Sequence, residues 1–420
     1  MQVQLASVEA DIDGNVDHDG PFDVLVRANG PDLSVLNDRL GIELRDVPFE
    51  FSSRIAGNPA AFTLEELDLT SGQSRIMGTL NLELGEVKRI SGDLVSPYLN
   101  LNPWTDDGDE AAEAPPAEAS KYLFDETPVA QVIDIGLELD IRLEADQLDV
   151  SGAQYDRLDI GVLMTKDRLE IRPFGITGVR GGNITGELVL DSEVNPPRLD
   201  ATLHATDMKL LLGASEGQDP ATLPTSNVDM ELRGAGLTRR EMASSLDGRV
   251  RFSVGPGKLA PAAYSLIVSD FITELFRALN PYSEKQEFTE LECAVLAADI
   301  VSGQVTLEPV VFHTRQLTII SGGKINLDDE RLDVTFNTKQ RKGLGLSASD
   351  LVNPFIKVGG TLAKPSLQLD PAGTVVKGGI AVATGGLSIL ASSLVDRYFS
   401  SKDPCGDALK EIEKRDGELP

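Results

Sequence analysis

The sequence predicts a mostly β protein with a few helices, built as an elongated, curved antiparallel β-sheet whose repeated hairpin units form a groove. Three observations predict this fold. Apolar and polar residues alternate over long stretches, a pattern of glycine followed by alternating apolar residues recurs, and aromatic residues make up only 5% of the 420 residues. Strict alternation places every second side chain on the same face of a sheet. Recurrence along the chain indicates a series of related units.

The clearest hairpin is predicted for residues 317–336. An acidic turn, Asp328 to Glu330, separates two alternating stretches. The apolar positions that share one face of this hairpin are Ile325, Leu327, Leu332, Val334 and Phe336. Related patterns begin at Gly78 and Gly186, and a partial one begins at Gly248.

Composition divides the chain into four regions. Residues 1–104 are predicted as an N-terminal β-repeat region, 105–128 as an acidic Pro/Ala-rich loop or linker, 129–372 as a second β region and 373–420 as a C-terminal helical tail. The linker is predicted because residues 105–120 carry six acidic residues and two prolines, a composition that cannot bury a core.

The cleanest alternation runs from Leu137 to Glu144. Leucine and isoleucine occupy one face of this predicted strand, whereas acidic residues and one arginine occupy the other. Strands with a single apolar face are typical of antiparallel sheets that are wet on one side.

Two internal helices are predicted. The first lies near residues 238–247, where Thr238 and Glu241 have the spacing of a capping box. The second covers residues 261–279, because Pro261 suits a first helical position and an apolar stripe follows it up to Asn280-Pro281. A further helix is expected in the C-terminal region.

The stretch 378–395 carries no charged residue and is close to the shortest length that spans a bilayer. Its glycines and hydroxyl side chains favour an amphipathic or end-packing helix. An interfacial membrane contact and a true membrane span remain the alternatives.

The formal net charge of −29 argues against a nucleic-acid partner, because phosphates would be repelled. It also disfavours broad docking on anionic lipid headgroups. The first residues, Gln2 to Val8, alternate like a strand and do not have the pattern of a signal peptide. The chain is therefore expected to be cytosolic or to begin inside a longer polypeptide.

The chain contains two cysteines, Cys293 and Cys405. Two free thiols are one interpretation. The other is a single disulfide that ties the tail to the β region, which would indicate an oxidising compartment. Neither the cysteines nor the three histidines have the spacing of a zinc site, and we expect no metal and no cofactor.

No catalytic motif is present: the chain lacks G-x-S-x-G, a phosphate-binding loop, a dinucleotide-binding glycine pattern and H-E-x-x-H. We therefore expect a protein that is not an enzyme. Its binding capacity would rest on the apolar face of the sheet, which must be covered by protein or by ligand.

Two interpretations of that face remain open. It forms an ordinary core, covered by the 261–279 helix and by sheet curvature, or it forms a groove for acyl chains. A buried methylene is worth about 0.8 kcal/mol, so a long chain needs no polar contact to be held. The candidate groove residues are Leu139, Ile141, Leu143, Leu158, Ile160, Leu188, Leu190, Leu203, Ile325, Leu327, Val334 and Phe336.

Three ordered patterns carry a family resemblance. They are the Gly-x-φ-x-φ unit (φ, an apolar residue) with its return strand in 186–210, the stretch TRREMASSLDG at 238–248, and a set of short segments at 291–293, 320–327 and 358–365. In this order they resemble the C-terminal region of the AsmA family of bacterial envelope proteins, related to bridge-like lipid-transfer proteins of the TamB type. The resemblance covers residues 65–420 well and 1–64 more loosely.

The resemblance implies a periplasmic protein tethered to the inner membrane by an N-terminal helix, with a hydrophobic β-groove. It implies a role in outer-membrane biogenesis, in which lipid acyl chains move along the groove between inner and outer membrane. Expected partners are phospholipid or another acyl lipid, outer-membrane assembly or envelope proteins, and a membrane reached through the N-terminal helix and the C-terminal tail. This chain lacks the helix, so a fragment is expected. The alternative function is a non-catalytic periplasmic scaffold that assists outer-membrane protein assembly by pairing through an edge strand.

Overall fold

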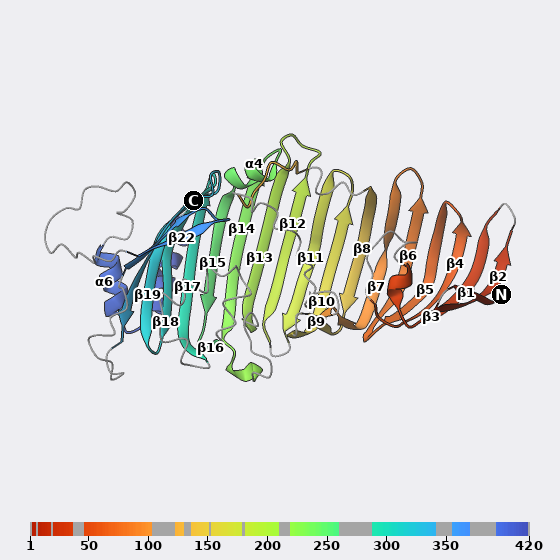
Figure 1. Ribbon diagram of the computed structural model, residues 1–420, viewed down its shortest axis with the longest axis horizontal. Helices are drawn as coiled ribbons and strands as arrows, with labels where there is room; N and C mark the ends of the chain where they lie inside the picture. The colour runs from red at the N-terminus through yellow and green to blue at the C-terminus, as the bar shows by residue number, and fades with distance from the viewer. Residues whose placement is uncertain are drawn as a thin grey trace. The chain divides into compact units, whose positions relative to one another are not determined.

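The computed structural model describes residues 2–5, 7–17, 20–36, 46–102, 122–129, 136–150, 153–178, 181–209, 219–259, 288–341, 355–369 and 392–418. The predicted fold class is confirmed, since the protein is mostly β, with extended antiparallel sheet made of many hairpin strands and a C-terminal helix (Figure 1). The chain forms two compact units. Unit 1 comprises residues 1–116 and 128–198, and unit 2 comprises residues 117–127 and 199–420.

Unit 1 contains twelve strands in its described residues. They are β1 (Gln2–Leu5), β2 (Val8–Val16), β3 (Phe22–Gly30), β4 (Phe49–Asn58), β5 (Ala61–Ser71), β6 (Ser74–Leu84), β7 (Lys88–Asn100), β8 (Leu137–Ala145), β9 (Leu148–Val150), β10 (Ala153–Met164), β11 (Arg168–Gly178) and β12 (Asn183–Asp191). A short 3-10 helix, η1 (Leu33–Leu36), follows β3.

The strands β1 to β7 pair antiparallel in succession, as do β8 with β10, β10 with β11 and β11 with β12. The pair β7–β8 is the exception, because these two strands run parallel, with Gly92 opposite Ile141. The short strand β9 pairs parallel with β7 and antiparallel with β10. A parallel pair cannot be closed by a tight turn, so the chain leaves the sheet after β7 and returns to it at β8.

Three glycines of the recurring pattern, Gly78, Gly248 and Gly323, have a positive φ inside strands, and so does Gly92. Gly78 and Gly92 have φ of 148° and 159°, and a Cβ built on them would lie 2.1 Å and 2.0 Å from a carbonyl oxygen of the facing strand. Gly248 and Gly323 in unit 2 repeat this geometry. Only glycine allows such a close approach of two backbones, which is why the pattern keeps this residue.

Unit 2 holds the remaining strands: β13 (Arg198–Lys209), β14 (Thr225–Ala235), β15 (Asp247–Val254), β16 (Gly257–Leu259), β17 (Thr289–Val301), β18 (Gln304–Thr314), β19 (Leu317–Asn326), β20 (Leu332–Gln340), β21 (Phe355–Gly360) and β22 (Pro365–Leu369). From β14 they follow the antiparallel order β14, β15, β17, β18, β19, β20, β21, β22, and β16 extends the pairing of β15 on β17. A second 3-10 helix, η2 (Pro220–Thr222), precedes β14.

The predicted hairpin at 317–336 is confirmed as β19 and β20. Ile325 lies opposite Leu332 on its last paired position, and the acidic residues form the turn. Gly323 lies opposite Val334, so the recurring glycine sits within the strand.

The predicted helix near 238–247 is present as α4 (Arg239–Ser244). Its N-cap is Thr238, whose hydroxyl accepts a hydrogen bond of 3.2 Å from the backbone N–H of Glu241. The Glu241 carboxylate accepts a hydrogen bond of 2.7 Å from the N–H of Leu237, one residue before the position that a standard capping box uses. The helix is shorter than predicted, because Asp247 already belongs to β15.

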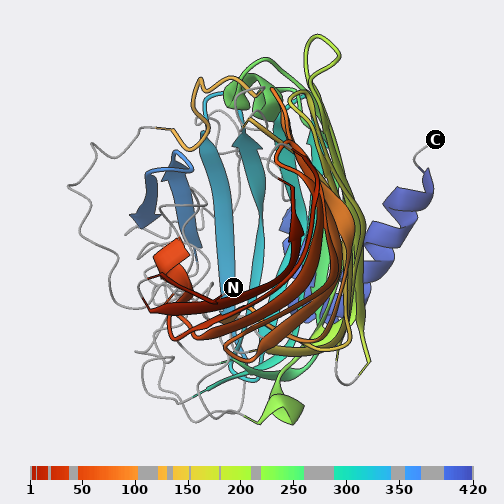
Figure 2. The ribbon, with the colours of Figure 1, turned by 90° about the vertical axis from the view of Figure 1, so that its right-hand side faces the viewer.

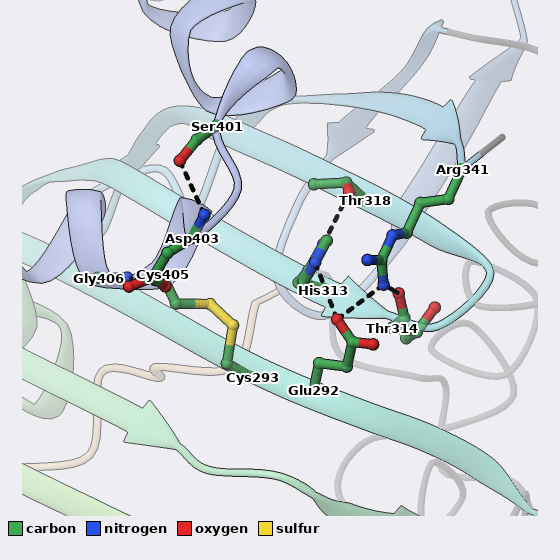
Figure 3. The surroundings of a disulfide bond; sticks show 10 residues. All are labelled: Glu292, Cys293, His313, Thr314, Thr318, Arg341, Ser401, Asp403, Cys405 and Gly406. Carbon is green, nitrogen blue, oxygen red and sulfur yellow. Dashed lines mark hydrogen bonds and ion pairs between the residues drawn. A yellow bond between two sulfur atoms is a disulfide. The ribbon is translucent and has the colours of Figure 1, made fainter.

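Two C-terminal helices complete unit 2: α6 (Ser392–Ser400) and α7 (Pro404–Glu418). A disulfide joins Cys405 of α7 to Cys293 of β17, the pairing that the sequence left open (Figure 3). Tyr398, Ala408 and Ile412 of the two helices pack on one face of the sheet, against a set of nearly inaccessible side chains. Those sheet residues are Val295, Ala297, Val311 and Ile320.

Several predictions concern residues outside the described part of the chain. They are the acidic segment 105–120, the helix 261–279 and most of the uncharged stretch 378–395. Among the helices of the described residues, none has both the length and the apolar character needed to cross a bilayer.

Candidate functional site: an apolar face of unit 1

One face of unit 1 carries an unbroken row of apolar residues across ten strands, β2 to β8 and β10 to β12. Neighbours in this row are directly opposed pairs of the strand register. The row, called the central row below, is Gly14, Val24, Ile55, Leu64, Leu80, Gly92, Ile141, Val162, Ile171 and Leu188.

A second row runs beside the central row on the same face, at a distance of two residues from it in each strand. This flanking row is Val16, Phe22, Gly57, Phe62, Leu82, Ile90, Leu139, Met164, Leu169 and Leu190. Neither row contains a polar or charged side chain. Because neighbouring strands lie about 4.8 Å apart, each row is roughly 40 Å long.

The two rows keep part of their surface in contact with solvent. Val24 and Met164 are buried, Gly14 is exposed and Val16 is 70% exposed, whereas the other members are half-buried. Helix η1 lies on this face at one end, where Leu33 packs against Val8 and Phe49. Figure 2 shows the strands of unit 1 bent around the side that carries η1, so the apolar face is the concave one.

The opposite face of unit 1 is charged. Arg54 binds Asp23 at 2.5 Å, and Arg89 binds Glu138 at 2.6 Å across the parallel pair β7–β8. The hydrogen bond from Arg54 holds the pKa of the Asp23 carboxyl below its ordinary value. On this face β11 carries Glu170, which is buried between arginines of its own strand. The sheet thus separates an apolar concave face from a solvated, ion-paired face.

The predicted groove residues of unit 1 lie together on the apolar face. Leu139 and Leu190 belong to the flanking row, and Ile141 and Leu188 belong to the central row. Leu143 and Ile160 pair with each other two residues from the central row, on the side away from the flanking row. Leu158 is 6% exposed and packs with Leu143 and Ile160 in a core cluster at that rim.

Four predicted groove residues of unit 2, Ile325, Leu327, Val334 and Phe336, lie on the sheet face opposite to α6 and α7. Leu327 and Val334 are buried, and Ile325 and Phe336 are half-buried in the same clusters. Leu203 is half-buried on β13. This face is more tightly packed than the apolar face of unit 1.

Sequence reasoning missed the part of the rows that lies before residue 139. Val24, Ile55, Leu64 and Leu80 continue the central row, but no candidate was named in residues 1–138. The signal that could have found them is the recurring glycine. In β4–β6 the alternation is interrupted by a bulge at Glu66, where φ is 50°, and by the positive φ at Gly57 and Gly78.

Another concave feature of unit 1 is a hollow at the end of β2–β5. It is lined by Glu9, Asn29, Glu50 and Thr70 on the polar side, together with Phe49 and neighbouring turn residues. None of the predicted groove residues lines it. Among the described residues, no group of three or more His, Cys, Asp or Glu side chains is arranged to hold a metal ion.

Comparison of the chain with protein-family models, with curated protein sequences and with solved structures found no match.

Proposed function

We propose that this protein is a non-catalytic protein of bacterial envelope biogenesis that binds lipid acyl chains on its apolar β surface and conducts them between inner and outer membrane. The observation that carries the proposal is the pair of rows in unit 1. Twenty directly paired positions contain no polar side chain, and most of them are only partly buried. Partly exposed apolar surface of this extent is typical of an interaction site, and its composition suits an apolar occupant.

An acyl chain meets this requirement better than a polar ligand. Each methylene that leaves water contributes about 0.8 kcal/mol, and no hydrogen bond must be formed to keep it. The rows are far longer than the few strands that a single small molecule would cover. The absence of polar groups in both rows favours transport of an apolar chain over chemistry on it.

The disulfide supports the compartment that the proposal requires. Cys293 and Cys405 are bonded, and structural disulfides persist in oxidising compartments such as the periplasm. The ordered resemblance to the AsmA family supports the same location, with tethering to the inner membrane.

Native mass spectrometry of the protein purified from an envelope fraction tests the proposal, with solvent extraction of the bound material. Ile141→Asp and Leu188→Asp place a charge in the central row. Val95→Asp is the matched control, because Val95 is 48% exposed and lies on the opposite face, paired with Glu144. Circular dichroism establishes that each variant is folded.

We expect bound lipid in the wild-type protein and in Val95→Asp, and its loss in both central-row variants. A folded, monodisperse wild-type protein that carries no lipid would overturn lipid binding. That outcome would favour the periplasmic scaffold instead, which requires neither row to be occupied.

A further inference from the structure

Residues 122–127, called the strap below, are held on unit 2 by a small number of side chains. The carboxylate of Glu330 accepts hydrogen bonds from the backbone N–H groups of Leu123 and Phe124, at 2.7 Å and 2.6 Å. Glu330 is 0% exposed and has a φ of 55°, an uncommon backbone conformation for a residue with a side chain. The turn between β19 and β20 is therefore shaped to present this carboxylate to the strap.

The second attachment is the first turn of α4. The backbone N–H groups of Arg239 and Arg240 donate to the carbonyl oxygens of Thr127 and Asp125, both at 3.1 Å. The Arg240 side chain binds Glu126 at 2.6 Å and lies 4.2 Å above the ring of Tyr122. The ion pair with Glu126 is peripheral, since Glu126 is 68% exposed.

Phe124 is the strap residue that enters the apolar face of unit 2. It packs against a cluster that includes Ile300, Val305 and Leu327. Ile300 and Val305 belong to a rim row of directly opposed positions on the face that does not carry α6 and α7. The row is Leu232, Gly248, Ile300, Val305, Ile325 and Leu332.

The strap covers this rim with one inserted ring, and its other apolar residue points elsewhere. Leu123, the neighbour of Phe124, is 63% exposed. No strap residue belongs to a strand of the sheet. If the strap left, water would hydrate the Glu330 carboxylate, so its two hydrogen bonds would be exchanged and not simply lost. The strap is thus a cover whose removal leaves the sheet pairing intact.

We propose that the strap is a removable cover of the apolar rim of unit 2, and that an acyl chain displaces it by taking the place of Phe124. This inference rests on the proposed function, because it assigns the regulation of the same apolar surface. Ring and acyl chain are both apolar and compete for the same side chains, so binding of one weakens binding of the other by linkage.

The first measurement follows the strap without any ligand. Hydrogen exchange of the Leu123 and Phe124 amides reports dissociation from Glu330. Glu330→Gln removes the charge that holds both amides, and Asp328→Asn is the matched control because it makes the same chemical change at an exposed position of the same turn. We expect at least about tenfold faster exchange of both amides in Glu330→Gln only. Equal exchange rates of these amides in the two variants would contradict the proposal that Glu330 holds the strap in place as a cover.

The second measurement adds dodecanoyl lysophosphatidylcholine, a zwitterionic single-chain probe, below its critical micelle concentration. Binding is measured by native mass spectrometry and exchange by the same two amides. We expect the probe to accelerate their exchange while the β17–β18 ladder stays protected. Phe124→Ser is expected to bind the probe several-fold more tightly than wild type, and the matched Leu123→Ser variant is expected to bind it equally.

The outcomes separate the two proposals. If the probe binds but neither accelerates strap exchange nor distinguishes Phe124→Ser from Leu123→Ser, displacement of the strap is wrong and lipid binding stands. If the probe binds to none of these proteins, lipid binding itself is wrong. Displacement then fails with it, whatever the exchange rates of the Glu330 variants.

Discussion

Arg251, in the middle of β15, forms an ion pair of 2.7 Å with Asp416, near the end of α7 and 165 residues later in the chain. The same guanidinium binds Asp299 of β17 at 2.5 Å and donates to the Ala298 carbonyl oxygen at 2.8 Å. Its side chain is only 11% exposed. Helix α7 is thus held near its C-terminal end by this arginine and near its N-terminal end by the disulfide at Cys405.

Replacing Arg251 by methionine is expected to lower the free energy of unfolding by about 2–4 kcal/mol, because Asp416 and Asp299, both partly buried, each lose an ion pair with this guanidinium. Urea unfolding followed by circular dichroism measures the change. Arg249→Met is the control, since Arg249 is 35% exposed and pairs with Glu231 at the surface, where a pair is worth about 0–1 kcal/mol. Equal losses in the two variants would contradict the role of Arg251.

Removal of the disulfide is expected to destabilise the protein by about 2–5 kcal/mol, because the bond closes a loop with a sequence separation of 112 residues. The measurement compares urea unfolding of the oxidised protein with that of the Cys293→Ser/Cys405→Ser variant. Reductant should lower the stability of the wild-type protein and leave the double variant unchanged. Identical midpoints for the oxidised and reduced wild type would refute this expectation.

Gly92→Ala is expected to cost about 2–4 kcal/mol of stability. A Cβ at this position would lie 2.0 Å from the carbonyl oxygen of Thr79, and the φ of 159° disfavours any side chain. Gly175→Ala in β11 is the control, because the nearest atom to its Cβ would lie 3.9 Å away. That change is expected to stay within about 0.5 kcal/mol of wild type. A Gly92→Ala protein as stable as Gly175→Ala would show that the strands can separate locally.

The stability of the protein is expected to depend on pH through His313, which Figure 3 shows with its neighbours. Burial is the main cause that lowers the pKa of His313, and the charge of Arg341 adds to it, whereas Glu292 and Asp403 act in the opposite direction. The folded protein therefore releases the proton more readily than the unfolded chain, whose histidine pKa is about 6.5. The contribution of neutral His313 to stability is therefore complete above about pH 6.5, the pKa in the unfolded chain. It declines as the pH falls from there through the lowered pKa of the folded protein.

The urea midpoint at pH 7.5 and at pH 5.0 tests this dependence. His313→Asn is expected to flatten the decline relative to wild type, because asparagine does not titrate in this range. The Nδ1 atom of His313 lies 2.8 Å from the Thr318 hydroxyl. Asparagine is chosen because its neutral side-chain amide can replace this contact. A variant with the same pH dependence as wild type would assign the decline to other groups.

Local periodicity predicted the strands well where one face is continuously apolar. The alternation from Leu137 to Glu144 is β8, and the 317–336 hairpin is β19 and β20. Periodicity could not predict that β8 pairs parallel with β7, because the order and direction of neighbours in a sheet depend on contacts between distant segments.

The strap shows the limit of composition. Residues 105–128 were predicted as one loop or linker because their acidic residues and prolines cannot form a core. The structure places Tyr122 to Thr127 on unit 2, where Glu330 and Phe124 make the decisive contacts. Glu330 was predicted only as part of an acidic turn, and nothing in its neighbours along the chain indicates that it is buried.

The uniform central row has a consequence for motion. Under the proposed function, an acyl chain that shifted by one strand would exchange one set of leucine, isoleucine and valine contacts for another of similar kind, except at Gly14 and Gly92. Such a shift would break no hydrogen bond with either row. The proposal therefore implies that the row itself sets no direction, and that net flow would be decided by where chains are loaded and where they are withdrawn.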